Sequence, residues 1–298
     1  MIKTPDYKLI FALMGVAIVW GTTYLGIRVA VETIPPWFVT AIRQTIASLI
    51  LLIILLRKKE LKWMDWPYMR RQLLVSILMI VIANGMTTAA EKTIPSGLTS
   101  LLNALNPLVV FVGSVVIGLQ KPSLKGFIGL MIGFLGVAFI FRDGINDLLD
   151  PNYKTGILLL FIAITGWAAG TIYTKKYVFQ SSNIFLDLFY QFVFSAIIQL
   201  GLAFLVSGDT SVATWSSTSL MAVVYLAVFG SVVGYFCYHY ALKKVTATDV
   251  SILSYFNTVI ALFLGWLILD EVITFDIVIA TVLIILGVFI TNYRREKI

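Results

Sequence analysis

The residues of this chain that could do chemistry are few, and they lie inside long apolar stretches. The sequence of 298 residues contains one cysteine, Cys237, and one histidine, His239. A single thiol cannot close an internal disulfide, and this pair cannot supply the several ligands of a metal site. A nucleophile with a neighbouring base is equally hard to assemble. The sequence therefore predicts no metal, no cofactor and no enzyme activity.

Arg43 is the most costly polar residue, because a charge near the centre of a bilayer costs on the order of 2.5–3.5 kcal/mol. Two roles would justify that cost. The guanidinium could bind a ligand carboxylate through two parallel hydrogen bonds, or it could pair with Glu91 or Asp187 as a clamp between helices. These two acids are also the candidates for proton coupling, and His239 is either a proton relay or a hydrogen-bond partner.

Polar side chains recur every four residues in two of the apolar stretches. Residues four apart share one face of a helix. We predict that both stripes line one cavity; the alternative is that they hydrogen-bond to neighbouring helices. The first stripe is Thr40, Gln44 and Ser48, and the second is Asp187, Gln191, Ser195 and Gln199.

Amide and aromatic side chains complete the candidate site. Asn106 and Asn257 lie in the middle of their stretches, and Pro107 removes a backbone donor, which predicts a break in that helix. Aromatic rings can cover an apolar ligand group and still offer a hydroxyl or an indole N–H. The predicted substrate-binding residues are Trp20, Tyr24, Arg43, Gln44, Asn106, Trp167, Gln191, Tyr238, His239 and Asn257.

Composition places these residues in a membrane. Hydrophobic residues make up 59% of the chain and charged residues 12%, and the mean hydropathy is +0.95. Ten apolar stretches each approach the ~20 residues that cross a bilayer. We therefore predict an all-α integral membrane protein with ten transmembrane helices, over residues 9–29, 36–56, 73–91, 97–119, 124–142, 155–175, 183–206, 217–241, 247–269 and 273–293.

Charge placement predicts the orientation of these helices. Most of the 22 Lys and Arg residues fall in segments that are cytoplasmic if the N-terminus is cytoplasmic, and ten spans return the C-terminus to the same side. The net charge of +7 thus indicates orientation and contact with membrane lipid rather than binding of nucleic acid. The first span is expected to remain as an anchor, because no signal-peptide cleavage site follows it.

The two halves of the chain are weakly similar to each other. A shift of 151 residues aligns Asn106 with Asn257, and a shift of 147 aligns Trp20 with Trp167. Each half has an odd number of helices, so the second half enters the membrane from the opposite side. We predict two inverted five-helix repeats, which can exchange conformations and so support alternating access.

The chain resembles the EamA family of drug/metabolite transporters over about residues 9–293, as two tandem units, 9–142 and 153–293. The resemblance implies a carrier of bacterial inner membranes, often an exporter of amino acids and other metabolites. The first helix lacks the embedded glutamate of the related small multidrug exporters, which disfavours a multidrug cation antiporter. The motifs that carry the resemblance are Val19-Trp20-Gly21-Thr22-Thr23-Tyr24, Arg43, Asn106-Pro107, and Leu269-Asp270-Glu271 leading to Leu286-Gly287-Val288.

We therefore expect a multi-pass secondary transporter of the bacterial inner membrane. Its expected cargo is small metabolites, amino acids or similar zwitterions above all, moved by export or facilitated diffusion. The alternatives are a proton-coupled exporter of drugs or other metabolites, and a non-catalytic channel or scaffold. The expected partners are a small-molecule substrate and membrane lipid. The chain is expected to be a monomer or a homodimer, since a ridge of glycines in the fifth span could pack within or between chains.

Overall fold

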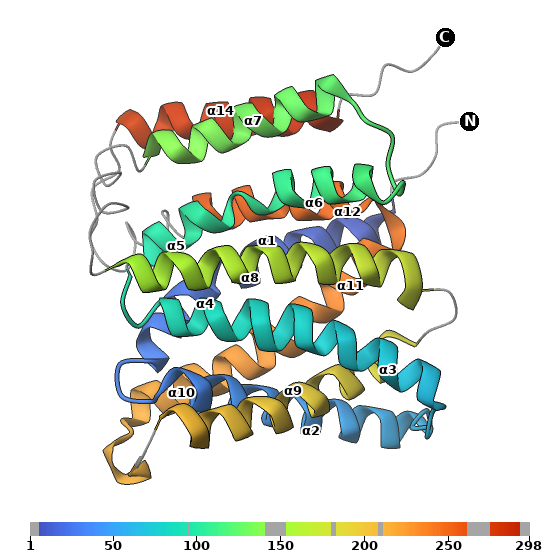
Figure 1. Cartoon of the computed structure of the whole chain (residues 1–298), viewed down its shortest axis with the longest axis vertical. Helices are drawn as coiled ribbons and strands as arrows, with labels where there is room; N and C mark the ends of the chain where they lie inside the picture. The colour runs from blue at the N-terminus through green and yellow to red at the C-terminus, as the bar shows by residue number, and fades with distance from the viewer. Residues whose placement is uncertain are drawn as a thin grey trace.

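Long helices that run side by side form the protein, and both chain ends lie at the same side of the bundle (Figure 1). We call the side with the chain ends the terminal side and the opposite side the distal side. The computed structural model describes residues 6–94, 96–140, 153–179, 183–207, 211–260 and 275–292.

The first half of the chain contributes eight named segments. Three of them, α3, η1 and α4, follow one another without a gap, and η1 is a π-helical segment. These segments are α1 (Tyr7–Ala30), α2 (Pro36–Lys58), α3 (Trp66–Val75), η1 (Ser76–Asn84), α4 (Gly85–Ala90), α5 (Ser96–Asn103), α6 (Asn106–Val116) and α7 (Leu124–Ile140).

The second half follows a similar order, with π-helical segments η4 and η6 and a short 3₁₀ turn, η5. The segments are α8 (Lys154–Tyr173), η4 (Thr174–Val178), α9 (Ile184–Val206), η5 (Val212–Thr214), α10 (Ser217–Tyr225), η6 (Leu226–Val233), α11 (Gly234–Lys244), α12 (Ala247–Ser251) and α14 (Phe275–Asn292).

Local sequence explains where several helices begin. Asp6 caps α1, since its carboxylate accepts a hydrogen bond from the backbone N–H of Leu9 at 3.2 Å. Pro36 occupies the first position of α2, where a missing N–H costs nothing. Thr246 and Asp249 form a capping box at the start of α12. These caps satisfy N–H groups that the first turn of a helix leaves without partners.

Most helices lie where the apolar stretches predict them. The third begins earlier than predicted, at Trp66, and the fourth is divided into α5 and α6 just before Pro107. Parts of the ninth and tenth predicted spans fall outside the described residues. Within the described residues, six helices are long and apolar enough to cross a membrane: Tyr7–Ala30, Pro36–Lys58, Trp66–Ala90, Lys154–Val178, Ile184–Val206 and Ser217–Lys244.

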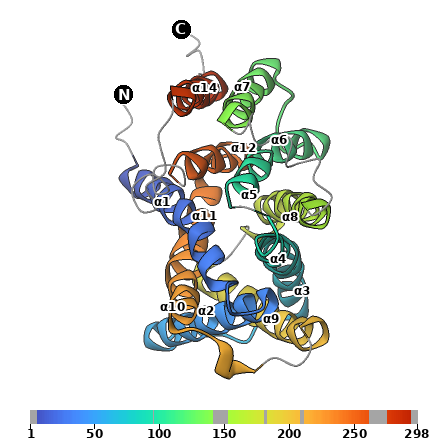
Figure 2. The same ribbon diagram turned by 90° about the vertical axis from the view of Figure 1, so that its left-hand side faces the viewer.

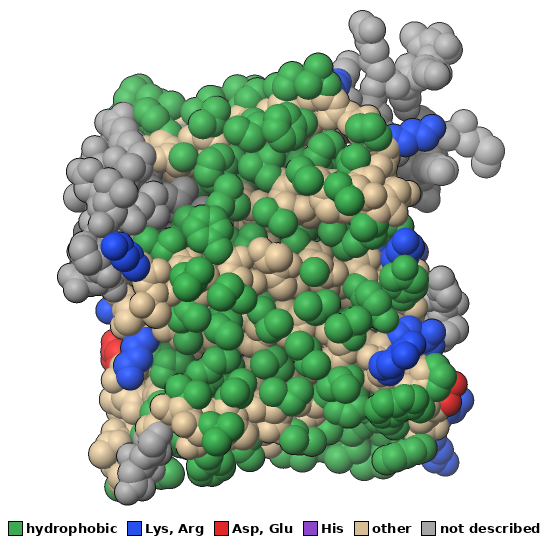
Figure 3. Space-filling model, in the orientation of Figure 1, with side chains coloured by type: hydrophobic (Ala, Val, Ile, Leu, Met, Phe, Trp, Pro, Cys, Tyr) green, Lys and Arg blue, Asp and Glu red, His purple; other side chains and the backbone are tan. Residues whose placement is uncertain are grey.

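The surface supports a membrane setting. Hydrophobic side chains cover the middle of the face seen in Figure 3, whereas Lys and Arg side chains gather at its two opposite edges. Large apolar residues are widely exposed, including Phe11, Phe204 and Leu205, which are 71%, 67% and 83% exposed. Exposed apolar surface on this scale would be a liability in water but is the expected outer surface of a protein in lipid.

The helices form a layered bundle with a distinct pair at each end. Helix α7 packs along α14 at one end and α2 packs along α9 at the other, while the remaining helices lie between them (Figures 1 and 2). Gly129 of α7 faces Gly287 and Thr291 of α14, so a Cβ at Gly129 would lie 2.8 Å from the carbonyl oxygen of Gly287. Part of the predicted glycine ridge is therefore used within this chain.

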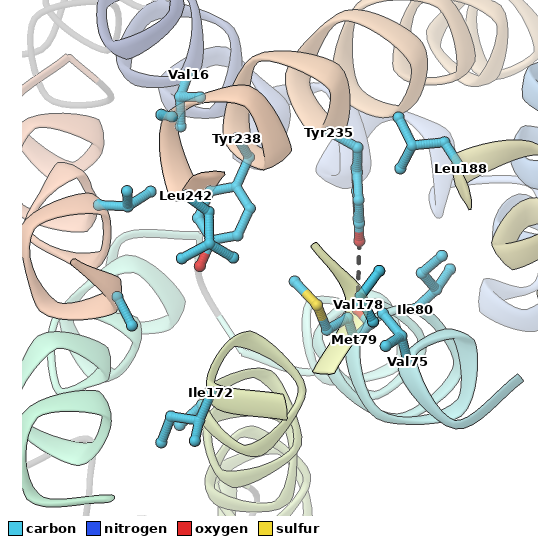
Figure 4. Close-up of a cluster of buried hydrophobic side chains, with 14 of the residues drawn as sticks. Val16, Val75, Met79, Ile80, Ile172, Val178, Leu188, Tyr235, Tyr238 and Leu242 are labelled. Atoms are coloured by element: carbon cyan, nitrogen blue, oxygen red, sulfur yellow. Dashed lines mark hydrogen bonds between the residues drawn. The ribbon is translucent and has the colours of Figure 1, made fainter. Parts of the chain in front are cut away.

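A large apolar cluster joins the two halves on the terminal side of the bundle. It includes Val16 of α1, Met79 of η1, Ile172 of α8 and Leu242 of α11 (Figure 4). Tyr235 reaches from α11 across this cluster, and its hydroxyl donates to the backbone carbonyl of Met79 at 3.3 Å. The centre of the bundle is thus closed by packed side chains toward the terminal side.

Candidate functional site

A cavity of about 110 Å³ lies between the central helices. Its volume is of the same order as a ~150 Å³ apolar cavity that binds benzene, so it suits a small solute. The walls come from α1, α2, η1, α4, α5, α6, α8, α11, α12 and the helical residues after α12. The predicted site residues that line it are Trp20, Tyr24, Arg43, Asn106, Trp167, Tyr238 and Asn257.

Arg43 is the charged group of the cavity lining. Its side chain is 2% exposed, and its Nε donates to the Ser231 hydroxyl of η6 at 2.8 Å. Gly230 makes room for the guanidinium, because a Cβ at that position would lie 3.0 Å from Nη2. The hydrogen-bonded clamp with Glu91 does not form, since neither carboxylate oxygen of Glu91 has a hydrogen-bond partner among the described residues.

Buried hydrogen-bond acceptors face the same cavity. Asn106 donates from Nδ2 to the Asn103 side-chain oxygen at 3.4 Å, which leaves its own Oδ1 without a partner in the described part of the chain. Asn84 Oδ1 and Ser254 Oγ are likewise buried and without described partners. Buried polar atoms are normally satisfied, so a cavity lined by such acceptors suits a ligand that carries hydrogen-bond donors.

Asn257 has a different local role. In the orientation that satisfies its amide, the side-chain nitrogen donates to the carbonyl oxygens of Leu253 and Ala17, at 3.0 Å each. The amide therefore ties α1 to the helical residues that follow α12, while the residue still lines the cavity.

Interrupted helices supply part of the cavity wall. The predicted break near Pro107 is found at residues 104–105, between α5 and α6. A second break, which the sequence analysis did not predict, lies at Ile252, after which the chain is helical again over 253–260. Both breaks adjoin lining residues, and irregular backbone at this depth in a membrane protein is tolerated where it lines a cavity.

Four aromatic rings form the terminal-side wall of the cavity. The ring centroids of Trp20 and Trp167 are 5.1 Å apart, as are those of Trp20 and Tyr238, and Tyr235 lies 5.6 Å from Trp20. The Trp20 indole donates to the Gly230 carbonyl at 3.1 Å. The edge-to-face contacts of Trp20 with Trp167 and Tyr235 favour a defined arrangement. Tyr235 and Tyr238 belong both to this wall and to the apolar cluster, so the cavity borders the cluster directly.

Gln44, Gln191 and His239 are not among the residues that line this cavity, so the structure does not bring them together with the other predicted site residues. Gln191 donates to the Gln72 side-chain oxygen at 2.8 Å. One ring nitrogen of His239 lies 3.0 Å from the Tyr235 carbonyl oxygen. The physical reason is that α2 and α9, which carry the stripes, pack against each other. In α9, Asp187, Gln191 and Gln199 hydrogen-bond to neighbouring helical segments. In α2, the Thr40 and Ser48 hydroxyl groups donate to carbonyl groups of their own helix.

The two predicted proton-coupling acids have contrasting surroundings. Asp187 Oδ1 accepts from the Tyr68 hydroxyl at 2.6 Å and from Gln72 Nε2 at 2.7 Å, which links α9 to α3. Glu91 is fully buried at the end of α4, and Arg28 donates to its backbone carbonyl at 2.8 Å. The Glu91 carboxylate is thus the one of these two groups that lacks hydrogen bonds in the described residues.

The lining residues that sequence reasoning missed include two polar ones, Asn84 and Thr87, which lie at the end of η1 and in α4. A signal was present, since both interrupt the apolar stretch over 73–91. It was weak because neither residue belongs to a stripe with regular spacing.

Comparisons with known proteins agree with this architecture. YedA, an uncharacterized inner membrane transporter of Escherichia coli (strain K12), is 30% identical over 258 residues, which cover 85% of this chain and 80% of YedA. YoaV, an uncharacterized transporter of Bacillus subtilis (strain 168), is 25% identical over 291 residues, 97% of this chain and 98% of YoaV. Protein PagO of Salmonella typhimurium (strain LT2) is 30% identical over 292 residues, 95% of this chain and 92% of PagO.

A solved crystal structure superposes with a TM-score of 0.81, covering 99% of this chain and 100% of the other at 16% sequence identity, which is a likeness of fold. The model of the EamA-like transporter family matches residues 7–142 and 154–293. The chain therefore belongs to the EamA-like transporter family and is a membrane transporter.

Proposed function

We propose that this transporter is a secondary carrier of the bacterial inner membrane that moves small metabolites by alternating access. The observation that carries the proposal is the mixed polar and aromatic cavity between the central helices of the bundle. A carrier needs a site that binds its cargo at mid-depth and is sealed from at least one side. The apolar cluster on the terminal side supplies such a seal.

The chemistry of the lining supports a zwitterionic cargo, amino acids or similar molecules first. Arg43 offers a cation for a carboxylate, and the oxygens of Asn84, Asn106 and Ser254 offer acceptors for an ammonium or hydroxyl group. The aromatic wall can cover an apolar side chain. We include Trp20, Tyr24, Trp167, Tyr238 and Asn257 with them in the proposed site, and give Gln44, Gln191 and His239 roles in helix packing.

The arrangement of the helices supports ten spans built as two inverted repeats, over residues 9–142 and 153–293. Helices that the repeat makes equivalent lie side by side: α2 with α9, and α7 with α14. Broken helices line the cavity from both halves. The basic segments would place both termini in the cytoplasm. Since α7 packs on α14 within the chain, we propose a monomer as the transporting unit.

Glu91 supports a second candidate, a proton-coupled exporter. A fully buried carboxylate without a described hydrogen-bond partner, close to the distal end of the cavity, is a costly feature to retain. Protonation would remove that cost. In this second candidate function, Glu91 exchanges a proton with the solution on the distal side. Asp187, which accepts hydrogen bonds from Tyr68 and Gln72, holds α9 against α3.

The test is uptake of a panel of labelled amino acids into proteoliposomes, with and without a pH gradient. We expect saturable uptake of at least one of them, reduced strongly by Arg43→Ala. A response to the gradient that Glu91→Gln abolishes would support proton coupling, and no response would favour facilitation. If no amino acid saturates the protein while nucleotides, sugars or drugs do, the zwitterion assignment is wrong.

A further inference from the structure

The two halves of the chain make the same charge-assisted hydrogen bond, from a cationic side chain to a backbone carbonyl group, at opposite sides of the bundle. Arg28, at the end of α1, donates to the Glu91 carbonyl oxygen at 2.8 Å. Lys175, at the end of the helix formed by α8 and η4, donates to the Leu242 carbonyl oxygen at 2.7 Å. The shift of 147 residues relates Arg28 to Lys175, and the shift of 151 relates Glu91 to Leu242. Each cation thus caps carbonyl groups at a helix C-terminus.

One helical turn closer to the centre, the halves differ. On the terminal side, the hydroxyl groups of Thr171 and Tyr238 are hydrogen-bonded at 2.7 Å and buried. The same two shifts relate Thr171 to Tyr24 and Tyr238 to Thr87. The equivalent pair therefore also consists of one tyrosine and one threonine, with the two types exchanged between the helices.

Tyr24 and Thr87 do not form the equivalent contact in the part of the chain that the structure describes. Both are partly exposed, both line the cavity, and they have no hydrogen bond to each other among the described contacts. The Thr171–Tyr238 pair instead adjoins the apolar cluster that closes the terminal side. The hydrogen bond between the two hydroxyl groups is thus made in the second half and is absent from the described contacts of the first half. One turn away, the hydrogen bond from a cation to a carbonyl group is made in both halves.

A second pair of equivalent positions, on contacts that join the two halves, also differs. Trp20 donates to the carbonyl of Gly230 in the π-helical segment η6. The equivalent pair is Trp167 and Met79 of η1, and the Met79 carbonyl accepts from Tyr235 instead. The equivalent positions of the repeat thus differ in their contacts at this second place as well.

We propose that the two tyrosine–threonine pairs are the alternating gates of this carrier. Thr171–Tyr238 closes the terminal side in the state described here, and Tyr24–Thr87 closes the distal side in the opposite state, when Thr171–Tyr238 separates. The proposal rests on the alternating access of the proposed function. Each hydroxyl pair stabilises one state only, so it shifts the balance between the states rather than the affinity of the cavity.

The test measures the balance between the states with two cysteine reporters in a Cys237→Ala background. Ile27→Cys reports access from the distal side, since Ile27 lines the cavity one turn from Tyr24. Leu242→Cys reports access from the terminal side, since Leu242 lies in the apolar cluster, is fully buried in this state and is not among the residues that line the cavity. Each reporter is labelled with a membrane-impermeant thiol reagent, applied from each side of oriented vesicles. The ratio of the two labelling rates then follows the ratio of the state open to the terminal side to the state open to the distal side.

We expect Tyr238→Phe to raise the Leu242→Cys rate relative to the Ile27→Cys rate about fivefold, the ratio that corresponds to a hydrogen bond of about 1 kcal/mol. Tyr24→Phe should lower the same ratio by a similar factor. The double variant should return to within about twofold of the parent. Thr171→Val and Thr87→Val should reproduce the effects of their respective partners without altering a ring.

The proposal is overturned if Tyr24→Phe and Tyr238→Phe shift the ratio in the same direction, or if neither shifts it beyond about twofold. It is also overturned if the tyrosine variants shift the ratio while Thr171→Val and Thr87→Val do not. Labelling requires no substrate. The gate proposal can therefore fail while uptake remains saturable, which would leave the proposed function standing. Conversely, uptake can fail to saturate while the two variants still shift the labelling ratio in opposite directions, which would count against the proposed function alone.

Discussion

At the scale of single residues, Arg43 and Gln44 are adjacent in the sequence but have different surroundings. Arg43 lines the cavity and is bonded to Ser231, whereas Gln44 is fully buried outside it, and neither of its amide atoms has a described partner. The sequence identified both as unusual because polar groups in apolar helices are costly. It could not say which one faces the cavity, since that depends on how α2 is rotated against α9.

This difference predicts opposite outcomes for two adjacent substitutions. Arg43→Gln should lower saturable uptake about tenfold or more, because a hydrogen bond to a charged group is worth about 1.5–3 kcal/mol. Gln44→Met keeps the volume and removes unsatisfied polar atoms, so uptake should stay within about twofold of the wild type. Kinetics in proteoliposomes at matched protein content check both, and a loss of uptake in Gln44→Met would contradict the site.

Asp187 gives a second prediction at this scale. Asp187→Ala would leave the buried donors of Tyr68 and Gln72 without their acceptor, at about 1–3 kcal/mol each. We expect a clearly lower thermal midpoint in detergent, and a smaller decrease for Tyr68→Phe, which removes one donor. Uptake per folded molecule should persist in both variants. If Asp187→Asn instead kept stability and abolished the response to a pH gradient, Asp187 would be a coupling residue.

At the scale of elements, the sequence predicted where most helices lie but not how they pair. Hydropathy indicates a span whichever neighbour it has, so it could not show that α2 lies along α9. The break near Pro107 was predictable because proline removes a donor. The break at Ile252 was not, since no proline or glycine marks it, and the π-helical segments η1 and η6 left no compositional signal either.

Glycines test the packing of α7 on α14. Gly129→Ala would place a methyl group against backbone atoms of Gly287 and Thr291, so we expect a loss of about 1–3 kcal/mol, seen as a lower thermal midpoint. Gly201→Ala in α9 is the matched control, because no atom lies within 4 Å of its added Cβ. An equal effect of the two substitutions would argue against close packing of α7 on α14.

At the scale of the whole molecule, the two halves are related but not identical in conformation. Their contacts agree at Arg28 and Lys175 and differ one turn away, at Tyr24 and Tyr238. The duplication was visible in the sequence because polar and tryptophan positions recur at fixed shifts. The difference between the halves was not visible, since the sequence alone does not show which of the equivalent contacts is made.

The central claim is that the cavity is exposed to one side at a time, and counterflow tests it most directly. Proteoliposomes loaded with an unlabelled amino acid that the protein takes up are diluted into a trace of the same amino acid in labelled form. A carrier predicts a transient accumulation of label above the outside concentration, which saturates with substrate. Simple equilibration of the label without that overshoot, at a rate proportional to concentration, would contradict alternating access and identify a channel.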